Sequence, residues 1–155
     1  EDKGYTSIVE FKDILARAMG GRIAEEIKYG ADKVTTGAGS DLRSATNIAR
    51  DMVIEQGMGE DLRDQVFHEA SGGGGMMFDR LTHERPYGEE TAKKIDENVK
   101  KLLEEASTRA RKVLLANRKQ LDELAKALLK DETLEEEQVN EVLKDTELPE
   151  GAELY

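Results

Sequence analysis

The segment 89–116 constrains the fold of this chain more than any other part, because one apolar stripe runs along its whole length. Its apolar side chains recur with the helical period of about 3.6 residues: Ile95, Val99, Leu102, Leu103, Ala106, Ala110, Val113 and Leu114. At a rise of about 1.5 Å per residue, the segment makes a helix roughly 40 Å long. We therefore expect a domain built from helices that pack on this one.

Two helices are expected before it. Ser7 and Glu10 have the spacing of a capping box, in which the hydroxyl and the carboxylate bond free backbone N–H groups at a helix start. The apolar period behind them predicts a helix over 8–28. A second helix is expected over 40–56 or 41–56, because Ser and Asp are favoured at helix starts and the apolar period resumes there.

Two shorter helices are expected after it. Asn117 is placed to cap a fourth helix with its leucines facing inward, and the residues 133–136 form a second capping-box pattern that opens a short fifth helix. Between 57 and 88 there is no helical period, and the four glycines 72–75 predict a long loop. The predicted fold class is all-α: a helical bundle of about five helices with one long Gly-rich loop.

The composition of the chain excludes several classes of protein and of functional site. The chain has 155 residues, of which 37% are hydrophobic and 37% charged, and its longest purely apolar run is 113–116. Such a short run predicts no membrane-spanning helix, so we expect this chain to be soluble. The absence of cysteine excludes disulfides, thiolate metal ligands and cysteine catalysis. We expect one helical domain over 1–148, itself incomplete, followed by an acidic tail over 149–155.

The net charge of −11 is concentrated at the C-terminal end, where ten acidic residues and one basic residue follow position 130. No basic stripe is present that could neutralise phosphates, so no nucleic-acid partner is expected. The acidic end is typical of a solvated helix and tail. The chain starts at Glu1 without an initiator Met, and we expect it to be a cut or truncated piece of a longer protein.

Asp41 is the main candidate for a functional residue. It follows Gly37 and Gly39 at the expected start of a helix. A carboxylate there can cap the helix, or it can bind zinc in a site shared with histidines. The spacing of residues does not choose between the two roles.

Other candidate ligands are weaker. A zinc-peptidase helix needs His at i and i+4 with Glu at i+1, and neither His68-Glu69 nor His83-Glu84 has the second His. We expect both histidines to be ordinary loop residues. The glycines 72–75 are followed by Met76 rather than by Lys and Ser or Thr, so this chain is not expected to bind nucleotide there.

Gly20 and Gly21 interrupt the first predicted helix, where each costs about 1 kcal/mol relative to alanine. Their presence suggests close approach by another helix or by a bound strand. Glu25 and Glu26 follow on the same helix, and each is open to three interpretations: a metal ligand, a group that supports a ligand, or part of a solvated face.

Six blocks of this chain together resemble the peptidase domain of FtsH-type AAA+ proteases. They occur in the family's order over about residues 5–145. The blocks are 20–27 (GGRIAEEI), 35–42 (TTGAGSDL), 45–53 (ATNIARDMV), 56–59 (QGMG), 88–96 (GEETAKKID) and 129–134 (LKDETL).

The resemblance implies an ATP-dependent zinc metalloprotease that unfolds and cleaves polypeptides in membrane-protein quality control. Family members are membrane-anchored hexamers whose peptidase domain faces the cytoplasm, or an organelle matrix or stroma. Two zinc ligands and the general base come from a His-Glu-x-x-His helix. The resemblance assigns the third zinc ligand to the position of Asp41, with Glu25 as a second candidate for a ligand or a supporting group.

The chain departs from the family pattern in three places. It has no His-Glu-x-x-His segment and no Walker A segment, and its loop 66–87 is not a close match. We therefore expect residues outside this chain to complete the zinc site. ATP is expected to bind only in the parent protein, and the chain alone is expected to be inactive. The alternative hypothesis is a catalytically dead helical scaffold that keeps the packing and oligomerisation surfaces of that domain.

Overall fold

The structure is a computed structural model that describes residues 6–63, 65–67 and 87–152. Within these ranges every regular element is helical. The elements are α1 (Ile8–Tyr29), η1 (Ala31–Lys33), α2 (Ala38–Ile54), η2 (Glu60–Leu62), α3 (Glu89–Ala116), α4 (Arg118–Asp131) and α5 (Glu136–Leu143), where η denotes a single 3-10 turn. The prediction of an all-α fold with five helices is confirmed.

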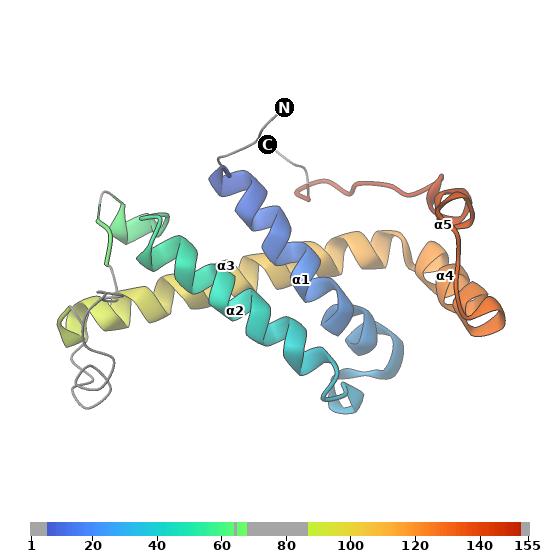
Figure 1. The fold of residues 1–155 in the computed structure, drawn as a ribbon, viewed down its shortest axis with the longest axis horizontal. Helices are drawn as coiled ribbons and strands as arrows, with labels where there is room; N and C mark the ends of the chain where they lie inside the picture. The colour runs from blue at the N-terminus through green and yellow to red at the C-terminus, as the bar shows by residue number, and fades with distance from the viewer. Residues whose placement is uncertain (1–5, 64, 68–86, 153–155) are drawn as a thin grey trace, which may run out of the picture.

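Helices α1 and α2 run antiparallel to each other and lie across the long helix α3 (Figure 1). The shorter helices α4 and α5 follow beyond the C-terminal end of α3. From α5 the chain turns back along α3 toward the start of α1 (Figure 1). The α1–α2 pair therefore forms the body of the molecule together with α3, and α4 and α5 form an extension at one end.

The core lies where α1, α2 and α3 cross. Its buried side chains come from the apolar stripes that the sequence predicts, and they include Leu15, Met19, Ile23, Ala45, Ala49, Met52, Val53, Ile95, Val99, Leu102, Ala106 and Ala110. The alanines at the crossings let the helix backbones approach closely, and the larger side chains fill the space between them. No residue of α4 or α5 is buried, so these two helices contribute little to the core.

The helix starts show where local sequence decides structure. At α1 the predicted capping box is present, with Ser7 N–H donating to Glu10 Oε2 at 2.8 Å and Glu10 N–H donating to Ser7 Oγ at 3.3 Å. At α5 the predicted box at 133–136 is wrong. The N-cap is Glu135, whose N–H donates to the Gln138 side chain at 2.8 Å.

Asn117 precedes α4 as predicted, but its side chain makes no capping bond there. It is buried and holds the C-terminal segment instead: Nδ2 donates to Glu147 O at 2.7 Å, and Oδ1 accepts from Glu147 N–H at 2.7 Å. Further along, Arg109 Nε donates to the Ala152 carbonyl at 3.2 Å, and Ala152 is buried. The division at residue 149 stays a prediction, and residues up to Ala152 pack against α3.

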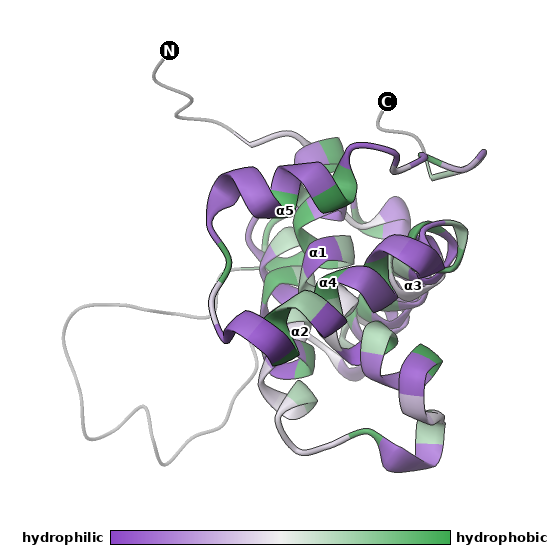
Figure 2. Ribbon diagram, turned by 90° about the vertical axis from the view of Figure 1, so that its right-hand side faces the viewer, coloured by the Kyte–Doolittle hydropathy of each residue, from purple (hydrophilic) through white to green (hydrophobic). Residues whose placement is uncertain are grey.

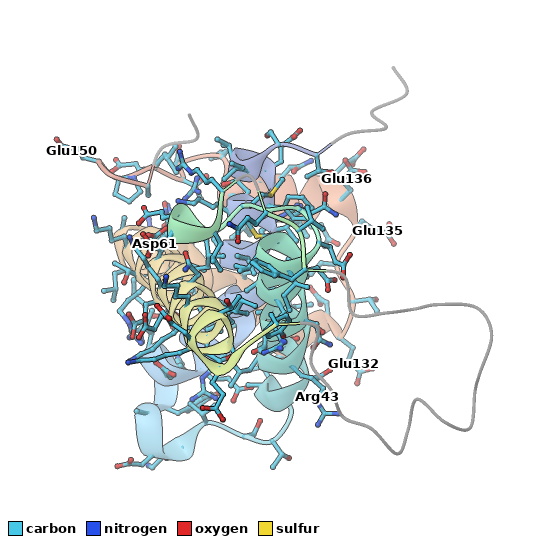
Figure 3. The ribbon with its side chains drawn as sticks, turned by 90° about the vertical axis from the view of Figure 1, so that its left-hand side faces the viewer. Arg43, Asp61, Glu132, Glu135, Glu136 and Glu150 are labelled. Atoms are coloured by element: carbon cyan, nitrogen blue, oxygen red, sulfur yellow. The ribbon has the colours of Figure 1, made fainter. Side chains whose placement is uncertain are left out.

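The surface of the described residues is mainly polar. Viewed from the end that carries α4 and α5, hydrophobic residues gather between the helices and hydrophilic residues cover their outer faces (Figure 2). Figure 3 shows Glu132, Glu135 and Glu136 on one side of the molecule and Glu150 on the other, so the acidic residues do not form a single patch. Within the described part of the chain, no helix is both long and apolar enough to cross a membrane.

Candidate functional site

Helix α2 begins at Ala38, before both starts expected from the sequence. Its first turn forms on backbone bonds, with Ala38 N–H donating to Thr35 O at 3.2 Å and Gly39 N–H donating to Thr36 O at 3.0 Å. Ala38 is buried, so packing fixes this start, and no side chain caps it. Asp41 therefore lies inside the first turn, and the alternative that its side chain caps the helix is wrong.

Within the described residues, the Asp41 carboxylate is half-buried and takes part in no hydrogen bond or ion pair. Its position in the first turn of α2 places it at the positive end of the helix dipole. Arg43, two residues further on, points outward from α2 (Figure 3). The carboxylate thus keeps its oxygen lone pairs available for a ligand.

Gly21 of α1 lies against this carboxylate. A Cβ atom built at Gly21 would lie 2.7 Å from Asp41 Oδ2 and 3.9 Å from its Cγ. The expectation of close approach is therefore met at Gly21, and the neighbour is the start of α2. It is not met at Gly20, where a Cβ would meet nothing within 4 Å.

Glu25 lies one helical turn after Gly21 and holds the loop that leads into α2. Its Oε2 accepts a hydrogen bond from the Thr35 N–H at 2.9 Å and another from the Thr35 hydroxyl at 3.2 Å. Of the three interpretations of Glu25, the structure supports that of a group that supports the candidate ligand. Thr35 was not singled out from the sequence, because only the fold brings it to Glu25.

Glu26 points to a different partner. It forms ion pairs with Arg22, at 3.2 Å on α1, and with Arg111 of α3. Its side chain is 15% exposed. Glu26 therefore fastens α1 to α3, and the two adjacent glutamates have separate structural roles.

The end of α1 is also fastened to α4. Lys28 Nζ pairs with Asp122 Oδ1 at 2.6 Å, Arg118 Nε pairs with Asp122 Oδ2 at 3.0 Å, and Arg118 Nη1 donates to Ile27 O at 3.3 Å. The hydrogen bond from Lys28, together with that from Arg118, lowers the pKa of the Asp122 carboxyl below its ordinary value. These contacts fix the end of α1 that carries Glu25.

The expected zinc site is not complete within the described residues. In the part of the chain that the structure describes, no three His, Cys, Asp or Glu side chains come together in a way that could hold a metal ion. His68, His83 and the glycines 72–75 lie outside the described residues. Asp41 has the donor type and the accessibility of a zinc ligand, and a zinc site at this position would need further ligands from outside the described residues.

The architecture is an all-α domain with one accessible carboxylate, Asp41, in the first turn of α2. Comparison with known proteins identifies the class. The model of Peptidase family M41 matches residues 1–142. The chain belongs to Peptidase family M41.

Curated relatives cover almost the whole chain. It is 42% identical over 140 residues to an ATP-dependent zinc metalloprotease FtsH of Chloroflexus aggregans, covering 89% of this chain and 21% of the relative. For the FtsH of Bacillus subtilis the identity is 38%, covering 97% of this chain and 23% of the relative. For the FtsH of Akkermansia muciniphila the identity is 44%, covering 93% of this chain and 18% of the relative. The chain thus spans about a fifth of the length of these relatives.

Proposed function

We propose that this chain is the C-terminal portion of the peptidase domain of an ATP-dependent zinc metalloendopeptidase that cleaves unfolded polypeptides. The observation that supports it most is Asp41: a half-buried carboxylate without a partner among the described residues, at a helix start, in a chain of Peptidase family M41. The curated relatives are named ATP-dependent zinc metalloproteases, which supports zinc and ATP as the cofactors of the whole protein.

The site residues of this chain have distinct tasks in the proposal. Asp41 offers a carboxylate oxygen as the third zinc ligand, and the fixed first turn of α2 holds its backbone in place. Glu25 ties down the preceding loop through Thr35. When bound, zinc would supply Lewis-acid polarisation of the peptide carbonyl and a water of lowered pKa.

The other ligands and the general base come, in this proposal, from a His-Glu-x-x-His segment outside the chain. Nucleotide binding belongs to a further part of the parent protein, and so does its membrane anchor. The parent protein assembles as a hexameric ring, with the peptidase domain facing the cytoplasm or an organelle matrix or stroma. By itself this chain cleaves no peptides, because one carboxylate cannot complete a zinc site. It also hydrolyses no ATP, because it contains no Walker A segment.

Proteolysis of casein by the full-length protein tests the proposal. With ATP and zinc present, the full-length protein should degrade casein, the Asp41→Ala variant should not, and the isolated chain should be inactive. Asp51→Ala is the matched control, because Asp51 is exposed on the same helix. Equal activity of the Asp41→Ala and Asp51→Ala variants would contradict the role of Asp41.

The alternative is a helical scaffold without catalysis, favoured by the observation that the described residues form no complete metal site. A full-length protein that binds no zinc and degrades no casein, yet still assembles into a ring, would establish the scaffold and overturn the protease.

A further inference from the structure

We infer that Gly21 is a positioning residue for metal binding, because it leaves the space in which the Asp41 carboxylate sits. This inference rests on the proposed role of Asp41 as a zinc ligand. It goes beyond that role by naming the residue on another helix that fixes where the ligand oxygen lies.

The space at Gly21 is specific. A Cβ there would lie 2.7 Å from Asp41 Oδ2, closer than carbon and oxygen approach without a bond. The atom in its way is the far end of a short side chain. A residue with a side chain at position 21 would therefore push the carboxylate aside and leave the backbone where it is.

The helices themselves cannot separate to relieve the contact. Just before and after Gly21, Met19 and Ile23 are buried in the core, and Ala45 and Ala49 of α2 are completely buried. Moving α1 away from α2 would open this packed interface, whereas rotating one carboxylate costs little. The displacement therefore falls on Asp41.

Glu25 holds the loop that leads into the helix of Asp41. It is four residues after Gly21, on the same face of α1, and its two hydrogen bonds to Thr35 hold the loop before α2. One face of α1 thus holds the loop before α2, through Glu25, and leaves space for the Asp41 carboxylate, at Gly21. A side chain at position 21 would therefore move the Asp41 carboxylate out of the position that it occupies between α1 and the start of α2.

Gly20 provides a matched control in the same helix. A Cβ at Gly20 would meet nothing within 4 Å, because Gly20 faces a groove of about 750 Å³ between α1, the C-terminal half of α3 and the C-terminal segment. Replacing either glycine by alanine raises helix propensity equally. The two variants therefore differ in one respect, the contact with Asp41.

The test measures zinc affinity of the full-length protein by competition with a chelator, alongside the melting temperature. Gly21→Ala should bind zinc about tenfold or more weakly, a loss typical of a displaced ligand support. Gly20→Ala should bind zinc like the wild type. Both variants should melt at or above the wild-type temperature, so that the loss of zinc cannot come from unfolding.

Cobalt substitution gives a second readout. The visible absorption of bound Co²⁺ reports its ligand geometry, and it should change in Gly21→Ala and stay unchanged in Gly20→Ala. Wild-type zinc affinity and a wild-type cobalt spectrum in Gly21→Ala would overturn the inference, provided that Asp41→Ala loses zinc in the same assay. If Asp41→Ala itself keeps wild-type zinc affinity, the proposed ligand role is wrong, and the inference about Gly21 is overturned with it.

Discussion

The carboxylate of Glu25 accepts hydrogen bonds from both the backbone N–H and the hydroxyl of Thr35, at 2.9 and 3.2 Å. This contact joins the end of α1 to the loop that opens α2. It explains how a helix can begin at Ala38 with no capping side chain, because the residues before it are already held in place. The candidate zinc ligand follows three residues later.

Replacement of Glu25 tests this contact. Glu25→Ala should lower the free energy of unfolding by about 1 kcal/mol, the typical net contribution of a hydrogen bond. It should also weaken zinc binding by the full-length protein, because the loop before Asp41 is released. Urea unfolding and chelator competition measure the two effects.

Glu26→Gln is the control for that prediction. It breaks the ion pairs with Arg22 and Arg111 and should also destabilise the fold, but zinc affinity should stay at the wild-type value. Loss of zinc affinity in Glu26→Gln equal to that in Glu25→Ala would show that both act only through overall stability.

Asn117 should matter for stability more than its place at a helix end suggests. Asn117→Ala removes both hydrogen bonds to the Glu147 backbone, so the N–H and C=O groups of Glu147 lose these partners. We expect a loss of about 1–3 kcal/mol in the free energy of unfolding. Hydrogen exchange should accelerate in residues 145–152. Asn140→Ala, at an exposed position on α5, should change neither quantity.

Because the core lies among α1, α2 and α3 and not in α4, replacing a leucine should cost much more stability in α1 than in α4. Leu15 is completely buried and Leu129 is 85% exposed. Leu15→Ala should destabilise the chain by about 2–5 kcal/mol, because it removes buried contacts and leaves a cavity. Leu129→Ala should change stability by less than about 0.5 kcal/mol. Similar losses in urea unfolding would contradict the placement of the core.

Asp122 should make stability depend on acid pH. Its pKa is lowered in the folded chain by the hydrogen bonds from Lys28 and Arg118. The stabilisation that it provides is therefore fully present above the unfolded-state pKa of about 4. It is lost as the pH falls through the lower pKa of the folded state.

Urea unfolding between pH 2 and pH 7 checks the sign. The difference in stability between wild type and Asp122→Asn should be largest near neutral pH and should shrink below about pH 4. A difference that stays constant over this range would mean that the charge of Asp122 contributes nothing.

The sequence predicts the helices well, because their apolar periods and the Ser7–Glu10 capping box are local signals. The start of α2 is different. Ala38 begins the helix because it is buried and because Glu25 holds Thr35, and both causes arise from packing between distant residues. The same applies to Asn117, whose partner Glu147 is 30 residues away.

The sequence names Asp41 as the candidate ligand and Glu25 as a second candidate, but it does not reveal the contacts of Glu25 with Thr35 or of Gly21 with Asp41. Asp41 was identified from the glycines before it and from the resemblance, yet its capping alternative could be rejected only with the structure. The Gly20–Gly21 pair indicated a close approach, and only the crossing of α1 and α2 shows that Gly21 alone makes it. Such contacts depend on helix rotation, which a residue pattern does not fix to within one position.

The most direct test of the account is the zinc content of the purified full-length protein, compared with that of its Asp41→Ala variant. Metal analysis after dialysis should find about one zinc ion per wild-type chain and close to none in Asp41→Ala, as expected when one of three protein ligands is lost. Circular dichroism should show that both proteins are folded. One zinc ion per chain retained by folded Asp41→Ala would contradict the central claim that Asp41 is a zinc ligand.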